Sequence, residues 1–152
     1  MAKIIGRKKE IEELQRISNR EEAQFVAVFG RRRIGKTFLI REGFKDKFAF
    51  YHTGISPLEL EGKNLIEKQL SAFNSTLARY GQEALESPKD WFEAFDRLID
   101  LLSAKKTKEK LIVFIDEMPW LDTPRSCFIS AFEHFWNGWG ASQDNLMLIV
   151  CG

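Results

Sequence analysis

Apolar positions along the chain follow two different patterns. Short, mainly apolar runs occupy residues 24–30, 47–54, 110–117 and 146–152. Runs of this length that are rich in Val, Ile and Phe are typical of strands covered on both faces of a parallel sheet. Elsewhere apolar residues recur at helical spacing among charges, as Ile11, Leu14 and Ile17 do within residues 7–18. This alternation of strands and helices predicts an α/β domain with a mainly parallel sheet.

Three further helices are expected to begin where a hydroxyl residue precedes proline. The pairs are Ser56-Pro57, Ser87-Pro88 and Thr123-Pro124. A Ser or Thr hydroxyl can accept hydrogen bonds from the free N–H groups of a first helical turn, and Pro suits the first helical position. The expected helices span about 57–80, 88–104 and 124–137, with a shorter helix from 36 to about 42.

The loop between the first strand and the short helix has the spacing G-x-x-x-x-G-K-T. It consists of Gly30, Arg31, Arg32, Arg33, Ile34, Gly35, Lys36 and Thr37, and Phe38 follows it. Glycines at these positions let backbone N–H groups converge on phosphate oxygens at a helix N-terminus. Lys36 would reach the β- and γ-phosphates, and the Thr37 hydroxyl would bind Mg²⁺. We expect residues 30–38 to bind a nucleoside triphosphate.

A pair of acidic residues ends the third apolar run, "LIVFIDE". Ligands of open α/β sheets bind at the carboxyl ends of the strands, so Asp116 and Glu117 are expected close to the phosphate loop. Asp116 would hold Mg²⁺, directly or through water. Glu117 would orient and deprotonate a water molecule that attacks the γ-phosphate. Lys36 and Glu117 are therefore the expected catalytic residues.

The three consecutive arginines of the loop allow several interpretations. The first possibility is that Arg31, Arg32 and Arg33 are solvated. The second is that they contact the phosphate backbone of a nucleic acid. The third is that one of them contacts the nucleotide or an acidic group of a partner subunit. The chain has 23 basic and 22 acidic residues and a net charge of +1. A nucleic-acid role would therefore need a local basic patch.

Together the two motifs resemble the P-loop NTPases that carry a catalytic glutamate after the second motif. The opening "IIGRKKEIEEL" resembles an apolar-Gly-Arg-x-x-Glu box found in the AAA-plus and STAND groups, with Glu10 at its last position. That resemblance implies adenine contacts from Ile5, Gly6 and Arg7. More narrowly, "FGRRRIGKT" with "FIDEMPWL" is similar to the archaeal-type ATPase family within the STAND group.

The resemblance implies a three-layer sandwich with strand order 5-1-4-3-2. The strand at 146–151 would then lie between those at 25–29 and 111–115, and the fifth strand is not found in residues 1–152. We expect these residues to form one ATPase domain that is truncated at its C-terminal end, with ATP and Mg²⁺ as ligands. The parent protein would hydrolyse ATP to drive or switch attached domains. Its expected partner is either an effector domain of the same chain or further copies of itself in a homo-oligomer. The alternatives are a nucleotide-gated signalling or assembly module with negligible hydrolysis and an ATP-dependent, DNA-associated protein.

Other features of the sequence indicate where the protein works. No segment approaches the roughly 18 consecutive apolar residues of a membrane span. Cys127 and Cys151 are far apart in the sequence and are expected to stay reduced, so we predict a cytoplasmic protein. His52 is expected to have a structural or solvated role rather than a nucleotide contact. The aromatic-rich segment 126–140 is expected to form core or a docking face, and docking is favoured.

Overall fold

The computed structural model describes residues 2–28, 35–60, 64–83 and 86–152, with side chains from residue 9 onward. The elements are α1 (Ala2–Ser18), β1 (Gln24–Val28), α2 (Lys36–Gly43), β2 (Phe50–Thr53), α3 (Leu65–Arg79), α4 (Trp91–Ser103), β3 (Leu111–Asp116), the 3-10 turn η1 (Met118–Leu121), α5 (Phe128–Gly138), the 3-10 turn η2 (Gly140–Ser142) and β4 (Leu146–Cys151). All four predicted strands are present within the described part of the chain.

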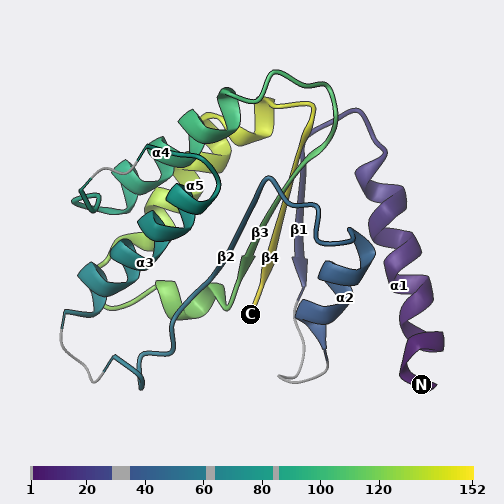
Figure 1. Ribbon diagram of the computed structural model, residues 1–152, viewed down its shortest axis with the longest axis horizontal. Helices are drawn as coiled ribbons and strands as arrows, with labels where there is room; N and C mark the ends of the chain where they lie inside the picture. Colours follow the sequence, from purple (N-terminus) through teal and green to yellow (C-terminus); the bar gives the residue numbers. More distant parts are fainter. Residues whose placement is uncertain (1, 29–34, 61–63, 84–85) are drawn as a thin grey trace.

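The strands form a parallel sheet with the order β1-β4-β3-β2. The last strand thus lies between the first and the third, as the resemblance implies. Helices α3, α4 and α5 cover one face of the sheet, and α1 and α2 cover the other (Figure 1). The predicted α/β three-layer architecture is confirmed. Every residue of β4 is buried because this strand has a neighbour on each side and helices on both faces.

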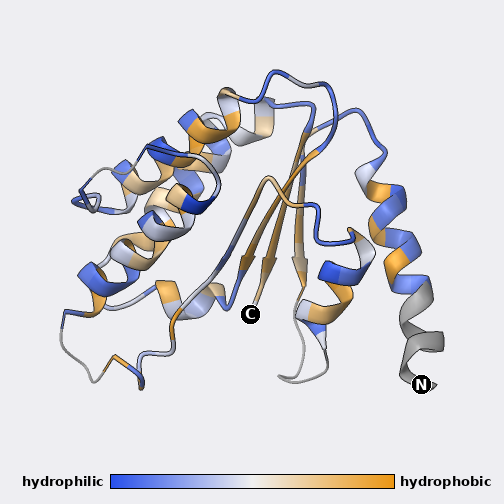
Figure 2. Ribbon diagram, viewed as in Figure 1, coloured by the Kyte–Doolittle hydropathy of each residue, from blue (hydrophilic) through white to orange (hydrophobic). Residues whose placement is uncertain are grey.

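The two faces of the sheet carry separate hydrophobic clusters, because successive side chains of a strand point to opposite faces. On the α3–α5 face, Val113 and Leu148 pack with aromatic residues of the helices. On the α1–α2 face, Phe114 and Ile149 pack with Leu39 and other residues of those helices. Each such buried side chain contributes about 1.5–3 kcal/mol relative to exposure. Figure 2 shows these strands as the apolar centre of the molecule, with hydrophilic loops at their amino ends.

The aromatic segment 126–140 belongs to the first of these clusters. Phe128, Phe132 and Phe135 are buried. Phe128 packs edge-on against Trp91 with ring centroids 4.9 Å apart, and Phe135 stacks on Phe95 at 5.1 Å. The favoured interpretation as a docking face was wrong, because α4 and the sheet already cover these rings.

The hydroxyl–proline pairs do not start helices, and this prediction was wrong at all three places. Helix α3 begins at Leu65, and Pro57 to Leu60 form a turn instead. Helix α4 begins at Trp91, where the Asp90 side chain accepts a hydrogen bond of 2.9 Å from the Glu93 N–H. A carboxylate at the N-cap both accepts this bond and interacts favourably with the helix dipole, so it displaces the cap expected from Ser87.

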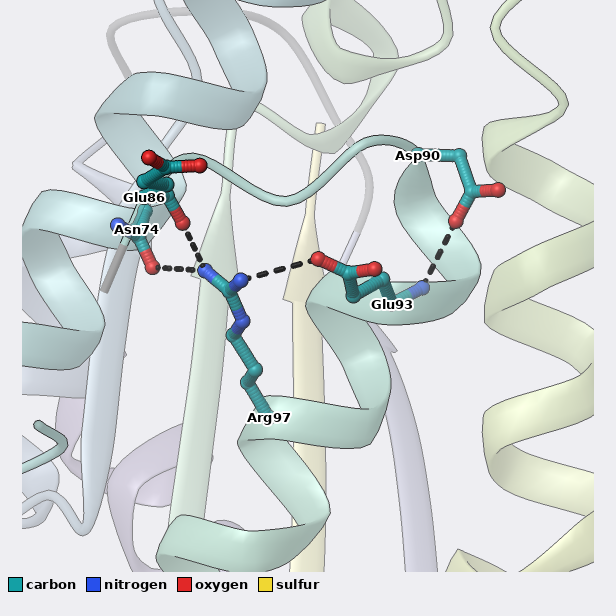
Figure 3. Close-up of polar contacts among 5 residues, drawn as sticks. All are labelled: Asn74, Glu86, Asp90, Glu93 and Arg97. Atoms are coloured by element: carbon teal, nitrogen blue, oxygen red, sulfur yellow. Dashed lines mark hydrogen bonds and ion pairs between the residues drawn. The ribbon is translucent and has the colours of Figure 1, made fainter.

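Arg97 fixes the packing of α4 against α3. Its Nη1 donates to Asn74 Oδ1 at 2.9 Å and to the Glu86 carbonyl at 2.6 Å, and its Nη2 donates to Glu93 at 2.9 Å (Figure 3). The guanidinium therefore joins two helices and the loop between them. This contact holds α3, which reaches the edge of the sheet where the candidate site lies.

Strand β1 lies at one edge of the described sheet and pairs with β4 alone. Phe25 of this strand is 41% exposed and packs edge-on against Phe132 and Trp136. No helix in the described part of the chain has the length and apolar character needed to cross a membrane.

Candidate active site

Residues of the two sequence motifs meet at the carboxyl edge of the sheet. Strand β3 ends at Asp116, and α2 starts beside it with Lys36 and Thr37. The Thr37 hydroxyl donates a hydrogen bond of 2.5 Å to Asp116 Oδ2. The Asp116 side chain is nearly enclosed, with an exposure of 4%. The proximity expected for the phosphate loop and the acidic pair is therefore observed for these residues.

Asp116 is oriented by contacts on both of its carboxylate oxygens. Oδ1 accepts a hydrogen bond of 2.9 Å from the Glu117 N–H, and Oδ2 accepts the bond from Thr37. Cys151 at the end of β4 lies next to it. Burial, and then the negative charge of Asp116, raises the pKa of the Cys151 thiol to about 12, so the thiol is neutral at physiological pH. Asp116 is thus held in one orientation at the floor of the site.

Glu117 lies at the rim, directly after the strand. Its backbone is left-handed, with φ 53°, and the N–H of Trp120 donates to its carbonyl at 3.1 Å as the chain enters η1. A left-handed conformation costs a residue other than glycine about 1–2 kcal/mol. Such strain persists where the surroundings enforce it, and it is frequent at functional sites. The half-buried Glu117 side chain is therefore presented on a constrained turn.

Lys36 crosses the edge of the sheet from α2 toward β4. Its Nζ donates a hydrogen bond to the carbonyl of Gly152, the residue that follows β4. Gly35 precedes the helix with φ 75°, a conformation that glycine adopts without strain. The lysine ammonium is therefore placed at the carboxyl end of β4.

Phe38 lies on the outer side of α2 and is 55% exposed. Together with Gly35, Thr37 and Arg41 it lines a surface hollow of about 520 Å³. The ring is therefore next to the phosphate-loop helix and open to solvent. Its expected contact with the nucleotide stays a prediction.

Several expected site residues cannot be placed. Gly30, Arg31, Arg32, Arg33 and Ile34 lie outside the described residues. The backbone of residues 5–7 is helical, because α1 begins at Ala2 rather than at residue 7 as the periodicity predicts. The side chains of Ile5 and Arg7 are outside the described part. The contacts expected from the arginines and from residues 5–7 therefore stay predictions.

His52 occupies the opposite face of the sheet from Asp116 and packs against α3. It is 3% exposed, its Nδ1 lies 2.8 Å from Thr76 Oγ1, and its ring is edge-on to Phe73. Burial, reinforced by the positive charge of Arg79, lowers the pKa of His52 to about 4. Of the structural and solvated roles expected from the sequence, the structure supports the structural one.

A family model for ATPase domains found predominantly in Archaea matches residues 4–152. The chain belongs to this family. The resemblance to the archaeal-type ATPase family is thereby confirmed, and the strand order β1-β4-β3-β2 is that of a P-loop NTPase-like fold. Membership in an ATPase family, with Lys36, Thr37 and Asp116 together, marks the carboxyl edge of the sheet as the candidate active site.

Two individual proteins are similar to this family member. The ATP-binding protein MJ0423 of Methanocaldococcus jannaschii, which is named as uncharacterised, is 42% identical over 44 residues; this covers 29% of the present chain and 75% of that protein. The solved structure of the Walker-type ATPase PABY2304 of Pyrococcus abyssi superposes with a TM-score of 0.61 at 21% identity, over 96% of the present chain. The chain spans 44% of that structure's length, so this likeness concerns the fold.

Two residues beside the site were missed from the sequence. Gln69 of α3 is completely buried, and its side-chain amide bonds to the loops that follow β2 and β3. Gly54 follows β2 and touches the backbone at Glu117. A signal for Gln69 was present, because it lies three residues after Ile66 and four before Phe73, on the apolar face of its helix. A polar side chain at such a position needs hydrogen-bond partners.

Proposed function

We propose that this ATPase domain binds ATP together with Mg²⁺ and that the protein containing it hydrolyses the ATP to drive or switch attached domains. Family membership and the ATP-binding relative support the nucleotide. The observation that carries the proposal is the contact between Thr37 and Asp116, which brings a hydroxyl and a carboxylate from two distant motifs to the start of one helix.

The residues present fit a magnesium ion. Mg²⁺ prefers oxygen ligands and usually takes only one or two from the protein, with the rest from phosphates and water. Thr37 and Asp116 supply a hydroxyl and a carboxylate within hydrogen-bonding distance of each other. Among the residues that the structure describes, no cluster of three or more His, Cys, Asp or Glu could hold a metal by itself. When bound with ATP, the ion would neutralise charge on the β- and γ-phosphates.

Catalysis of phosphoryl transfer requires mainly that the protein position the reacting groups and neutralise the charge on the phosphates. Residues of this chain can serve both purposes. Lys36 would exchange its hydrogen bond with the Gly152 carbonyl for one with the terminal phosphates. Asp116 would orient the Thr37 hydroxyl. Glu117, at the rim, would accept a proton from the attacking water, which then bonds to the γ-phosphorus as the bond to ADP breaks.

One observation favours a second candidate function, a nucleotide-gated module with negligible hydrolysis. Lys36 bonds to the residue at the end of β4, so withdrawing the lysine toward a phosphate would change a contact at the end of the central strand. Nucleotide binding alone would then alter this edge of the sheet without turnover. Further domains or a second subunit that contact this edge would then change their position or affinity.

Titration of ATP–Mg²⁺ onto the Lys36→Ala variant tests the proposal. Hydrogen bonds to charged groups contribute about 1.5–3 kcal/mol, so we expect the affinity for ATP–Mg²⁺ to fall about tenfold or more. Lys110→Ala is a matched control, because Lys110 also donates to backbone carbonyls, those of Arg20, Glu22 and Asp144, near the amino ends of the strands. The control should keep the wild-type affinity. Unchanged affinity in Lys36→Ala would refute the proposed site.

A further inference from the structure

The loops that follow β2 and β3 are in backbone contact beside Glu117. The N–H of Gly54, directly after β2, donates to the Asp116 carbonyl at 3.0 Å. A Cβ atom at position 54 would lie 2.7 Å from the Glu117 carbonyl oxygen and 3.3 Å from the Leu121 side chain. Real Cβ atoms do not approach so closely, so only glycine fits without a shift. The turn that presents Glu117 therefore rests directly on the backbone after β2.

Gln69 bridges these two loops with both atoms of its side-chain amide. Its Oε1 accepts from the Ile55 N–H at 3.2 Å, and its Nε2 donates to the Ile55 carbonyl at 2.7 Å. The same Nε2 donates to the Trp120 carbonyl at 3.2 Å. Ile55 follows Gly54, and Trp120 ends the turn that begins at Glu117. A single buried amide thus fixes α3 to both loops.

We propose that Gln69 is a positioning residue for Glu117. The strained backbone of Glu117 needs surroundings that hold it, and the turn from Glu117 to Trp120 is fixed at its far end by Gln69. Released from that bond, the turn would relax and move the Glu117 carboxylate relative to the attacking water. This inference rests on the proposed function, because it presupposes that Glu117 acts on that water.

The hydrogen bonds of the Gln69 side chain do not involve Lys36 or Thr37. Its partners are the backbone atoms of Ile55 and Trp120, whereas Lys36 and Thr37 contact Gly152 and Asp116. Loss of the amide should therefore lower the rate of hydrolysis and leave the affinity for ATP–Mg²⁺ nearly unchanged. A misplacement of about 1 Å at a reacting group can reduce a rate about a hundredfold.

The experiment compares two variants in the intact protein. Gln69→Met keeps the length of the side chain and removes its hydrogen bonds to Ile55 and Trp120. Leu77→Ala removes a fully buried side chain about two helical turns further along α3 and serves as a control for lost stability. For each we would measure kcat for ATP, the Kd for ATP–Mg²⁺ and the thermal unfolding midpoint. We expect kcat of Gln69→Met to fall about tenfold or more with Kd within about twofold, and kcat of Leu77→Ala to stay near wild type.

Gln69→Glu keeps the proposal testable even where Gln69→Met fails to fold. A carboxylate at this position can still accept from Ile55 but faces two carbonyl oxygens, and protonation restores one donor. The ratio of its kcat to that of the wild type should therefore rise as the pH falls. A ratio that does not change with pH, or a kcat that falls only in proportion to stability in every variant, would overturn the positioning role. Wild-type protein without Glu117-dependent turnover would instead contradict the proposed function.

Discussion

The Thr37 hydroxyl donates a hydrogen bond to the Asp116 carboxylate across 79 positions of the sequence. The contact exists because β3 and the strand before α2 are parallel members of one sheet, with β4 between them. The start of α2 and the end of β3 then meet at the same edge.

Asp116→Asn should make ATP hydrolysis require more Mg²⁺. The amide keeps the shape of the side chain but removes the negative charge that is buried beside Thr37. We expect the Mg²⁺ concentration at half-maximal turnover to rise about tenfold or more, the effect of losing a charged ligand. Magnesium titrations of steady-state ATPase activity measure it. Asp122→Asn, an exposed residue of the following loop, is the control. An unchanged Mg²⁺ requirement would contradict the proposed role of Asp116.

Gly54→Ala should reduce both stability and turnover. The new Cβ would lie 2.7 Å from the Glu117 carbonyl oxygen, so the two loops must separate. Overpacking of this kind costs about 1–3 kcal/mol. Gly138→Ala is a matched control, because its Cβ would meet only the His134 ring, at 3.8 Å. Chemical denaturation and ATPase assays of both variants test the prediction, and equal behaviour of the two would contradict it.

His52 should make the protein less stable in mild acid. The ordinary pKa of histidine is 6.5, so the unfolded chain binds a proton at this residue below about pH 6.5. In the folded state burial lowers the pKa of His52 to about 4, so the proton binds only below about pH 4. Between these values the unfolded state holds more protons, so the free energy of unfolding falls as the pH decreases, by at most about 3 kcal/mol. The His52→Phe variant should lose this slope, because an apolar ring fits between Phe50 and Phe73. Denaturation of both proteins between pH 7 and 4 measures the difference, and parallel curves would refute the prediction.

Arg97→Met should destabilise the domain by about 1–3 kcal/mol. The substitution removes the guanidinium that donates to Asn74, Glu93 and the Glu86 carbonyl in a partly buried contact (Figure 3). Arg16→Met is the control, because the ion pair of Arg16 with Glu13 is solvent-exposed and such pairs contribute little to stability. Urea denaturation distinguishes the two variants. A loss in Arg97→Met no larger than in Arg16→Met would show that the network adds little.

The sheet and the central part of the site could be predicted from the sequence because they depend on local patterns. The apolar runs predict four parallel strands. Phosphate binding at a helix N-terminus explains why Lys36 and Thr37 stand at the start of a helix and Asp116 at the end of a strand. The starts of the helices could not be predicted in this way. Asp90 and Ser87 are both good caps, and the structure shows that the Asp90 side chain takes this role by accepting from the Glu93 N–H.

Gln69 illustrates a second reason why the sequence was insufficient. Its partners are backbone atoms of Ile55 and Trp120, which any residue type could supply, so no motif encodes the contact. The aromatic segment at 126–140 illustrates a third. The periodicity of Phe128, Phe132 and Phe135 defines an apolar face, but only the placement of α4 shows that the face is already covered.

Hydrolysis and binding of ATP by the Glu117→Gln variant of the intact protein test the central claim most directly. The amide keeps the size of the side chain but cannot accept a proton from water. We predict that the Kd for ATP–Mg²⁺ stays within about twofold of wild type, while kcat falls about a hundredfold or more, the usual contribution of a general base. Equal rates of hydrolysis by the variant and the wild type would contradict the claim.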